Sequence, residues 1–152
     1  MEPLLPTLGR RNPLGAWLAL DSSLPALALL GEHERCGALY PAALAYIDTG
    51  LVSFSAVATA NPHLVAGIAA HAAGLHDKAR EHFEIATRQA RDLPRRLLQP
   101  TVLYWYGRAL SGASDESERL RGRAMIEAAL ADFRTLEMVT HANLAERFLR
   151  SQ

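Results

Sequence analysis

Residues 61–92, NPHLVAGIAAHAAGLHDKAREHFEIATRQARD, have the most regular helical pattern of the sequence. It opens with Asn61-Pro62, an N-cap residue type followed by proline at the first helical position. Gly74 is a typical helix end, so the first helix is expected to stop at about that point. The next helix, at 78–92, has charged residues on its outer sides and a stripe of small and apolar residues at Ala79, Phe83, Ala86 and Ala90. The sequence therefore predicts two helices joined by a short turn.

Helical patterns continue on both sides of this pair. They predict further helices at 13–20, 23–30, 34–48 and 51–59 before it, and at 100–110, about 120–136 and about 142–150 after it. Ser23 has the residue type of an N-cap, and Gly31 and Gly50 are typical helix ends. No segment alternates apolar and polar residues with a period of two, so we expect no sheet. The predicted fold class is all-α.

The composition limits the partners and the compartment. Sixteen Lys and Arg residues balance sixteen Asp and Glu residues. Without a net field of either sign, we expect no direct binding to nucleic acid or to an anionic membrane. The single cysteine, Cys36, excludes an intramolecular disulfide and multi-cysteine metal sites, which favours the cytoplasm. A hydrophobic fraction of 49% excludes disorder, and the length fits a short extension at 1–12 followed by one domain over 13–150.

The beginning of the chain has some features of a targeting segment. Arg10 and Arg11 precede an apolar stretch at 14–30, but Asp21 and Pro25 interrupt it. A membrane-spanning helix needs about 20 mostly apolar residues. No small-residue cleavage pattern follows the stretch either. We therefore expect neither export nor membrane insertion.

Internal repetition is the most informative feature of the sequence. Residues 78–93 align with residues 121–136 at a shift of 43, with small and bulky positions coinciding. The helices before them also align, with Gly67 over Gly107 at a shift of 40. The difference between the two shifts corresponds to a loop insertion at 112–118. Two helix-turn-helix units in tandem are therefore expected.

The expected units lie at about 61–93 and 100–137. In a repeat stack each unit covers only its neighbours, so both ends of the stack need covering. We expect the helices within 13–59 to cover one end and the helix at 142–150 to cover the other.

The spacing in the first unit resembles a tetratricopeptide repeat. That pattern has a small residue on the first helix and A-x-x-x-F on the second, here Gly67 and then Ala79, Phe83 and Ala86. Small residues let helix backbones approach, and a phenylalanine fills the space between units. The second unit departs from the pattern, with Gly122, Ile126 and Ala129 at the matching positions. The resemblance implies antiparallel helix pairs stacked as a short right-handed superhelix.

A longer part of the chain is similar to the C-terminal helical-repeat region of large bacterial signalling ATPases. These include class III adenylate/guanylate cyclases and related multi-domain transcriptional regulators. The similarity is carried by NPLGAWLALDSSLPALALLGEHERCGALYP at 12–41, GIAAHAAGLHDKAREHFEIATRQARDLPRRLLQPTVLYWYGRAL at 67–110 and RGRAMIEAALADFRTLEM at 121–138. It implies a regulatory or scaffolding module, since catalysis or DNA binding in such proteins resides in other domains.

The motifs that carry chemistry are missing from the sequence. It has no phosphate-binding G-x-x-x-x-G-K-[ST], no G-x-S-x-G and no H-E-x-x-H. His71, His76 and His82 are five and six residues apart, so they do not form the i, i+4 pair of a helical metal site. We expect His76 in the turn and His82 on a helix flank. The prediction is a protein that is not an enzyme and holds no metal or cofactor.

In helical-repeat proteins the first helices of the pairs line a concave surface where partners bind. The expected surface residues are Asn61, Leu64, Ile68 and His71 from one helix and Thr101, Tyr104 and Arg108 from the next. Tyrosine and arginine are enriched at interface hot spots, and Arg108 could hold a carboxylate through two hydrogen bonds. His71 could titrate near neutral pH. Trp105 and Tyr106 are expected in the core.

These observations predict a non-catalytic interaction or regulatory module of a bacterial signalling system. It would bind a peptide, a partner domain or a second copy of itself through the helix-lined face. The first alternative is a sensor that binds a small ligand in the same groove, which would require a deep enclosed pocket. The second is an enzyme without a known motif, which would require two convergent titratable groups with displaced pKa values in one cleft.

Overall fold

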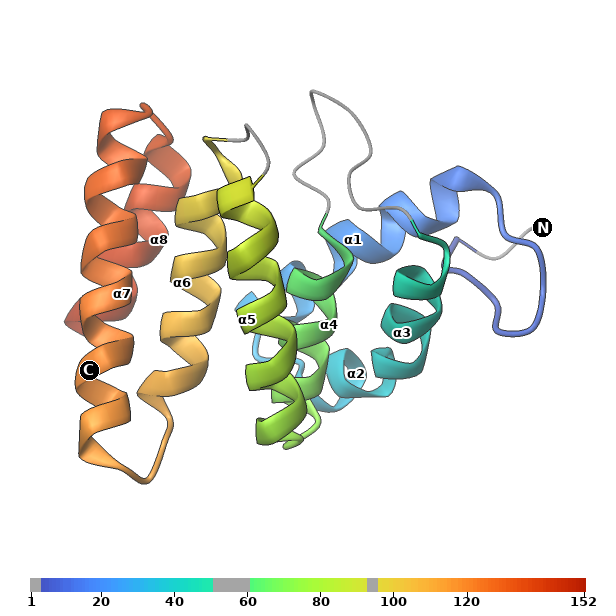
Figure 1. The fold of residues 1–152 in the computed structure, drawn as a ribbon, viewed down its shortest axis with the longest axis horizontal. Helices are drawn as coiled ribbons and strands as arrows, with labels where there is room; N and C mark the ends of the chain where they lie inside the picture. The colour runs from blue at the N-terminus through green and yellow to red at the C-terminus, as the bar shows by residue number, and fades with distance from the viewer. Residues whose placement is uncertain (1–3, 51–60, 93–95) are drawn as a thin grey trace. The chain divides into compact units, whose positions relative to one another are not determined.

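The computed structural model describes residues 4–50, 61–92 and 96–152. Within these ranges every regular element is an α-helix, so the predicted all-α class is confirmed (Figure 1). The helices are α1 (Leu14–Leu29), α2 (His33–Ala38), α3 (Tyr40–Asp48), α4 (Pro62–Ala72), α5 (His76–Asp92), α6 (Leu98–Ser111), α7 (Glu116–Thr135) and α8 (Val139–Arg150). The helix predicted at 51–59 lies outside the described residues.

The chain divides into two compact units, Met1–Ala86 and Thr87–Gln152. The division between the units falls after Ala86, within helix α5, and the single domain expected over 13–150 stays a prediction. Helix α5 therefore contributes its first part to the first unit and its last turns to the second. The stacking of helix pairs into a right-handed superhelix stays a prediction.

In the first unit, α4 is the central helix and packs against α1, α2 and α3. Its Asn61 N-cap is confirmed, because the Asn61 side chain accepts a hydrogen bond from the Leu64 N–H at 2.8 Å. Pro62 occupies the first turn, and Gly74 ends the helix with a positive φ of 73°. Every residue of α4 from Leu64 to Ala70 is buried, as expected of a helix surrounded by others.

Helix α1 corrects one prediction. The two short helices expected at 13–20 and 23–30 are a single helix, with Pro25 inside it and no cap at Ser23. The Ser22 and Ser23 hydroxyls instead donate to backbone oxygens one turn earlier, at 3.0 and 2.6 Å. Serines in the middle of a helix commonly make this back-bond, and it leaves the helix continuous.

The helix predicted at 34–48 is also different, because it divides into α2 and α3 at Leu39. Pro41 in the first turn of α3 explains the break, since proline is accepted in a first turn but interrupts the hydrogen bonds of a longer helix. Gly31 and Gly50 end their segments with positive φ angles of 77° and 72°, as predicted.

The contacts at aligned glycines recur in the two helix pairs. A Cβ atom built on Gly67 of α4 would lie 2.9 Å from the Phe83 ring of α5. A Cβ atom built on Gly107 of α6 would lie 2.7 Å from the Ile126 side chain of α7 and 2.6 Å from the Gly122 carbonyl oxygen. Each glycine therefore faces the bulky residue that the alignment assigns to it, and in each pair the absent side chain allows the helices to approach.

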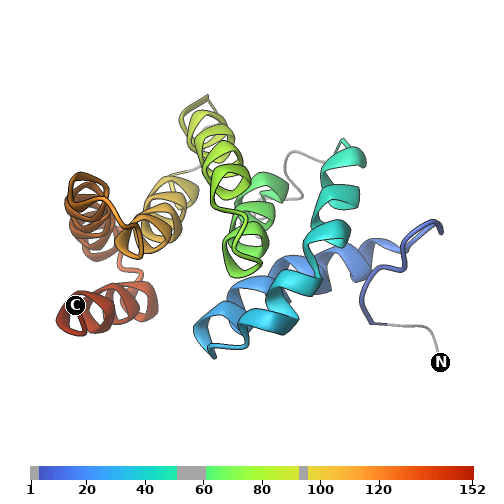
Figure 2. The same ribbon diagram turned by 90° about the horizontal axis from the view of Figure 1, so that it is seen from below.

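The second unit is a small bundle in which α7 packs against both α6 and α8 (Figure 2). Asp115 caps α7 by accepting from the Ser117 N–H at 3.2 Å, so this helix begins earlier than the predicted residue 120. Phe133 is fully buried and contacts the rings of Tyr104 and His141. Helix α8 thus covers one side of its own unit, with Ala142 and Ala145 buried.

Two further features bear on the sequence predictions. Cys36 is fully buried, and burial raises the pKa of its thiol to about 11, which leaves it a small packing residue. Among the described helices, none is both long enough and apolar enough to cross a bilayer.

Candidate functional site

The four residues predicted for the binding face of the first unit have different environments. Asn61, Leu64 and Ile68 are buried, and Asn61 is occupied as the cap of α4. Only His71 is partly exposed, and its ring lies 5.7 Å from the ring of His76. Three of the four side chains therefore serve the packing of the helix in this structure.

The three predicted residues of the second unit all belong to α6. The Thr101 hydroxyl donates to the Leu97 carbonyl oxygen at 2.9 Å, and Tyr104 is almost fully buried. Arg108 is partly exposed one turn beyond Tyr104. The prediction that Trp105 and Tyr106 are core residues is confirmed by their burial. Whether residues of the two units form one binding face stays a prediction.

Arg108 lies among three aromatic side chains. Its guanidinium carbon is 5.6 Å from the ring centre of Tyr104, 5.0 Å from that of Trp105 and 4.9 Å from that of Phe148 in α8. Contacts of a guanidinium with ring faces are attractive, because the face of an aromatic ring is electron-rich. One guanidinium N–H also donates to the Tyr104 hydroxyl oxygen at 3.0 Å. We call Tyr104, Trp105, Arg108 and Phe148 the Arg108 cluster.

The positive charge of Arg108 is not neutralised by an ion pair within the described residues. A guanidinium has five N–H donors, and Tyr104 accepts from one of them. The remaining donors lie at the edge of the guanidinium plane, where a bidentate acceptor would bind.

A cavity of about 250 Å³ lies next to the cluster in the same unit. Its lining combines apolar side chains with two arginines and one glutamate: Ser111, Glu116, Arg119, Leu120, Arg123, Ile126, Phe148, Leu149 and Gln152. Phe148 belongs both to this lining and to the Arg108 cluster. The cavity is therefore joined to the guanidinium site through one ring.

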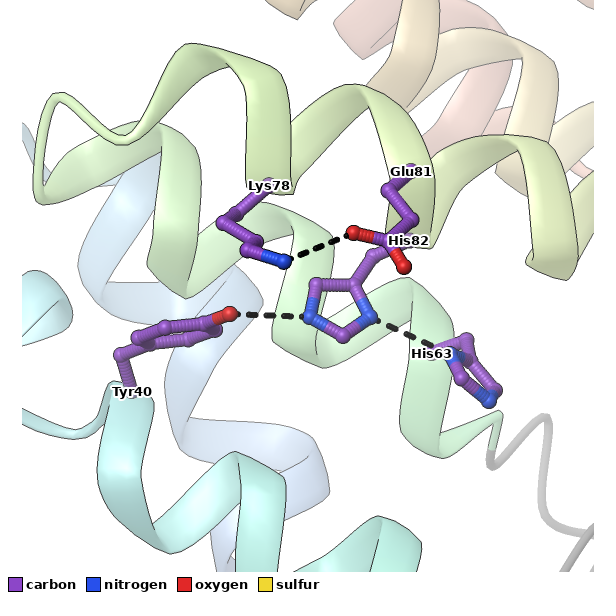
Figure 3. A network of polar contacts seen from close by, with 5 residues as sticks. All are labelled: Tyr40, His63, Lys78, Glu81 and His82. Atoms are coloured by element: carbon purple, nitrogen blue, oxygen red, sulfur yellow. Dashed lines mark hydrogen bonds and ion pairs between the residues drawn. The ribbon is translucent and has the colours of Figure 1, made fainter.

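The first unit contains a chain of polar contacts between Tyr40, His82 and His63 (Figure 3). The Tyr40 hydroxyl oxygen is 3.0 Å from His82 Nε2, and the Nδ1 atoms of His82 and His63 are 3.1 Å apart. These residues come from α3, α5 and α4, so the chain links three helices. His82 is buried, which corrects the expectation that it lies on a helix flank. The exposed Lys78–Glu81 ion pair, at 3.0 Å, lies beside it.

Two facing imidazole nitrogens must share one proton between them. A proton on both would set two N–H groups against each other, so at most one of these nitrogens donates. Burial and the neighbouring His63 lower the pKa of His82, while burial raises the pKa of Tyr40. Both shifts favour the uncharged forms that packing requires. No group of three or more His, Cys, Asp or Glu side chains in the described ranges is placed to hold a metal ion.

A third polar feature lies between α1 and α3. Burial raises the pKa of Asp21 to about 6, and its Oδ1 atom is buried without a hydrogen-bond partner. The Tyr46 hydroxyl is likewise buried without a partner, and burial followed by the charge of Asp21 raises its pKa to about 12. The Tyr46 ring stacks on Trp17 with ring centres 5.5 Å apart. Two buried polar atoms in one small region lower the stability of the first unit at neutral pH.

Comparisons with known proteins give no match. No protein-family model matches the chain, and no curated protein or solved structure matches it. The functional assignment therefore rests on the residues themselves.

Sequence reasoning found part of these sites. The spacing of Tyr104 and Arg108, one turn apart on one helix, already indicates that the two side chains meet. Phe148 was expected only to cover the end of the stack, because nothing in the sequence places α8 over α6. The contact of His82 with His63 and Tyr40 was missed for the same reason: the three residues are separated by 19 and 42 positions.

Proposed function

We propose that this chain is a non-catalytic helical module, similar to tetratricopeptide repeats, that binds a peptide or protein partner. The proposed setting is the cytoplasm of a bacterial signalling system. The proposed contact site is the Arg108 cluster in the second unit. The Arg108 cluster carries the proposal, because Arg108 is partly exposed, lies among aromatic rings and forms no ion pair with any residue that the structure describes.

The chemistry of the cluster favours recognition of another molecule. Arginine, tyrosine and tryptophan are the residue types that contribute most often to interface hot spots. The contacts with three rings and the hydrogen bond to Tyr104 restrict the Arg108 guanidinium, so a partner would meet an ordered donor. Ordering a side chain before binding lowers the entropic cost of association.

The pKa shifts in the first unit support a non-catalytic role. Tyr40, His82 and His63 form a set of titratable groups in contact there. A nucleophilic tyrosine would need a lowered pKa, whereas burial raises the pKa of Tyr40. The pattern is that of groups kept neutral by packing.

The cavity beside Phe148 bears on the alternative of a small-ligand sensor. Pockets for drug-sized ligands usually measure roughly 300–1,000 Å³ and enclose most of the ligand. The cavity at Phe148, at about 250 Å³, is smaller. Its size suits one side chain of a partner better than a whole cofactor-sized molecule.

Selection from a random peptide library tests the proposal. The purified chain is the bait, and an Arg108→Glu variant with the same melting temperature is used for counter-selection. We expect enriched peptides that bind the wild-type chain and lose binding to Arg108→Glu. Light scattering of the same two proteins measures self-association. The proposal is wrong if no peptide is enriched and both proteins are monomers at all concentrations, or if enriched peptides bind both equally.

A further inference from the structure

In the part of the chain that the structure describes, the guanidinium of Arg108 forms no ion pair, although its central carbon lies within 5.6 Å of three ring centres. Its N–H groups point outward in the guanidinium plane and Tyr104 accepts from one of them, so a further acceptor would bind along the edge of that plane. An acceptor with two oxygens in one plane matches two N–H groups of that edge. Partial removal of a cation from water is costly, and an arriving carboxylate offsets this cost. A carboxylate side chain is a group of a polypeptide that fits this edge.

Other arginines near the site are already engaged by groups of the chain. Arg119 donates to the carbonyl oxygens of Ala113 and Ser114 at 3.0 and 2.7 Å. Arg123 forms an ion pair with Glu127 at 3.0 Å. Arg108 has a single hydrogen-bond acceptor, the neutral Tyr104 hydroxyl, whereas Arg119 has two carbonyl acceptors and Arg123 has a carboxylate.

The cavity predicts a second feature of the partner, an apolar group next to the carboxylate. Leu120, Ile126, Phe148 and Leu149 supply its apolar lining, and Leu120 is 62% exposed. Phe148 belongs both to the cavity lining and to the Arg108 cluster, so the two contacts are neighbours on one unit. An apolar side chain entering the cavity would remove the exposed leucine from water, which stabilises a complex.

From these observations we infer that the partner is a polypeptide segment with an acidic side chain bound by Arg108 and a neighbouring apolar side chain bound in the cavity at Phe148. The inference rests on the proposed function, and it names the chemistry of the partner. A free small carboxylate would use only the first of the two contacts. The carboxylate could also come from the free C-terminus of a peptide that has no acidic side chain.

The test uses four sets of short peptides on the full chain. The first set is acetylated and amidated and contains leucine, glutamate and glycine in all orders. The second set has glutamine in place of each glutamate, and the third has serine in place of each leucine. The fourth contains leucine and glycine with a free C-terminal carboxylate. Acetate and glutarate serve as small carboxylates.

The fluorescence of Trp105 reports binding. The chain has two tryptophans, so a Trp17→Phe background leaves Trp105 as the single emitter. Arg108→Gln removes the charge, and Arg108→Lys keeps the charge but loses the planar donor edge. Arg121→Gln is the matched control, because Arg121 also lies over an aromatic ring of the second unit, with its guanidinium carbon 5.5 Å from the ring centre of Tyr106. Circular dichroism and melting temperature verify that each variant is folded.

We expect the glutamate set to bind best. Replacing glutamate by glutamine, or Arg108 by glutamine, should weaken binding about tenfold or more, since two hydrogen bonds to a charged group are lost. Arg108→Lys should lose a smaller factor, Arg121→Gln should change affinity by less than about twofold, and leucine-to-serine peptides should bind more weakly. The small carboxylates should bind far more weakly than the peptides.

Other outcomes overturn the inference in distinguishable ways. Equal binding of the glutamate and glutamine sets would show that no carboxylate is recognised, while the proposed peptide-binding function would stand. Stronger binding of the fourth set would assign the charge to a chain terminus, and binding of acetate or glutarate as tight as that of peptides would assign the site to a small ligand. Failure of every set to bind overturns the inference as well, and the library selection then decides the proposed function separately. The glutamate-to-glutamine comparison uses wild-type protein, so it holds even where a variant is unstable.

Discussion

The approach of α6 and α7 at Gly107 allows a test of the packing by a single methyl group. In Gly107→Ala the new Cβ atom would lie 2.6 Å from the Gly122 carbonyl oxygen and 2.7 Å from Ile126 Cγ1. The first of these atoms is backbone, so no side-chain rotation relieves the overlap. The two helices must move apart by several tenths of an ångström.

The expected loss of stability follows from two opposing effects. Adding a methyl group to a well-packed interface costs about 1–3 kcal/mol. Alanine in place of glycine within a helix contributes about 0.5–1 kcal/mol in the other direction. We therefore expect Gly107→Ala to lower the free energy of unfolding by about 1–2 kcal/mol. Gly67→Ala should cost less, because its Cβ meets the Phe83 ring, a side chain, at 2.9 Å.

Urea unfolding followed by circular dichroism measures both variants. Gly15→Ala is the matched control: it makes the same chemical change in α1, and nothing lies within 4 Å of its new Cβ atom. This control should gain up to about 1 kcal/mol from helix propensity. A Gly107→Ala chain as stable as the wild type, together with a stabilised Gly15→Ala, would contradict the close approach of α6 and α7.

Three further predictions concern polar groups of the first unit. Burial raises the pKa of Asp21 from 3.8 to about 6, so protonated Asp21 contributes fully to the stability of the folded chain below pH 3.8, and this contribution is lost as the pH rises to about 6. Asp21→Asn should therefore stabilise the chain by about 1–3 kcal/mol at pH 7. At pH 4 the same substitution should change the free energy of unfolding, measured with urea, by almost nothing. The lowered pKa of His82 has the opposite effect on stability, because the unfolded chain binds this proton before the folded chain does as the pH falls below 6.5. The urea midpoint of the wild type should therefore drop more between pH 8 and pH 5.5 than that of His82→Gln. Equal drops would contradict a buried neutral imidazole. Asn61→Ala removes the acceptor of the Leu64 N–H and should cost about 1–2 kcal/mol, whereas Asn143→Ala, at an exposed position of α8, should change the unfolding free energy by less than about 0.5 kcal/mol.

Much of the fold could be predicted because the relevant signals are local. The cap at Asn61, the glycine ends and the small-residue stripe all act within a few residues, and each lies where the sequence predicts it. The two alignments also agree with the contacts, since Gly67 faces Phe83 and the aligned Gly107 faces the aligned Ile126. The errors came from competing local effects: Ser22 and Ser23 bond back along α1, and Pro41 divides the next helix.

The sites were less predictable, because they depend on contacts between distant segments. Helical spacing brings Tyr104 and Arg108 together, but the position of Phe148 depends on how α8 folds over the bundle. Burial of Leu64 and Ile68 is similarly a tertiary effect. The repeat pattern alone assigned both residues to an exposed face, because it carries no information about how many other helices pack around α4.

The course of α5 determines how the protein can be cut for experiments. The division between the units falls at Ala86, in the middle of a regular helix, rather than in a loop. Up to Phe83 this helix packs on α4, and near its end the Ala90 carbonyl oxygen accepts from the Gln99 side chain at 3.1 Å. Fragments ending or beginning at residue 86 would each carry half a helix with unpaired backbone groups. Truncations that retain the whole of α5 in either fragment should yield better-folded pieces, and protease cleavage within it should be slow.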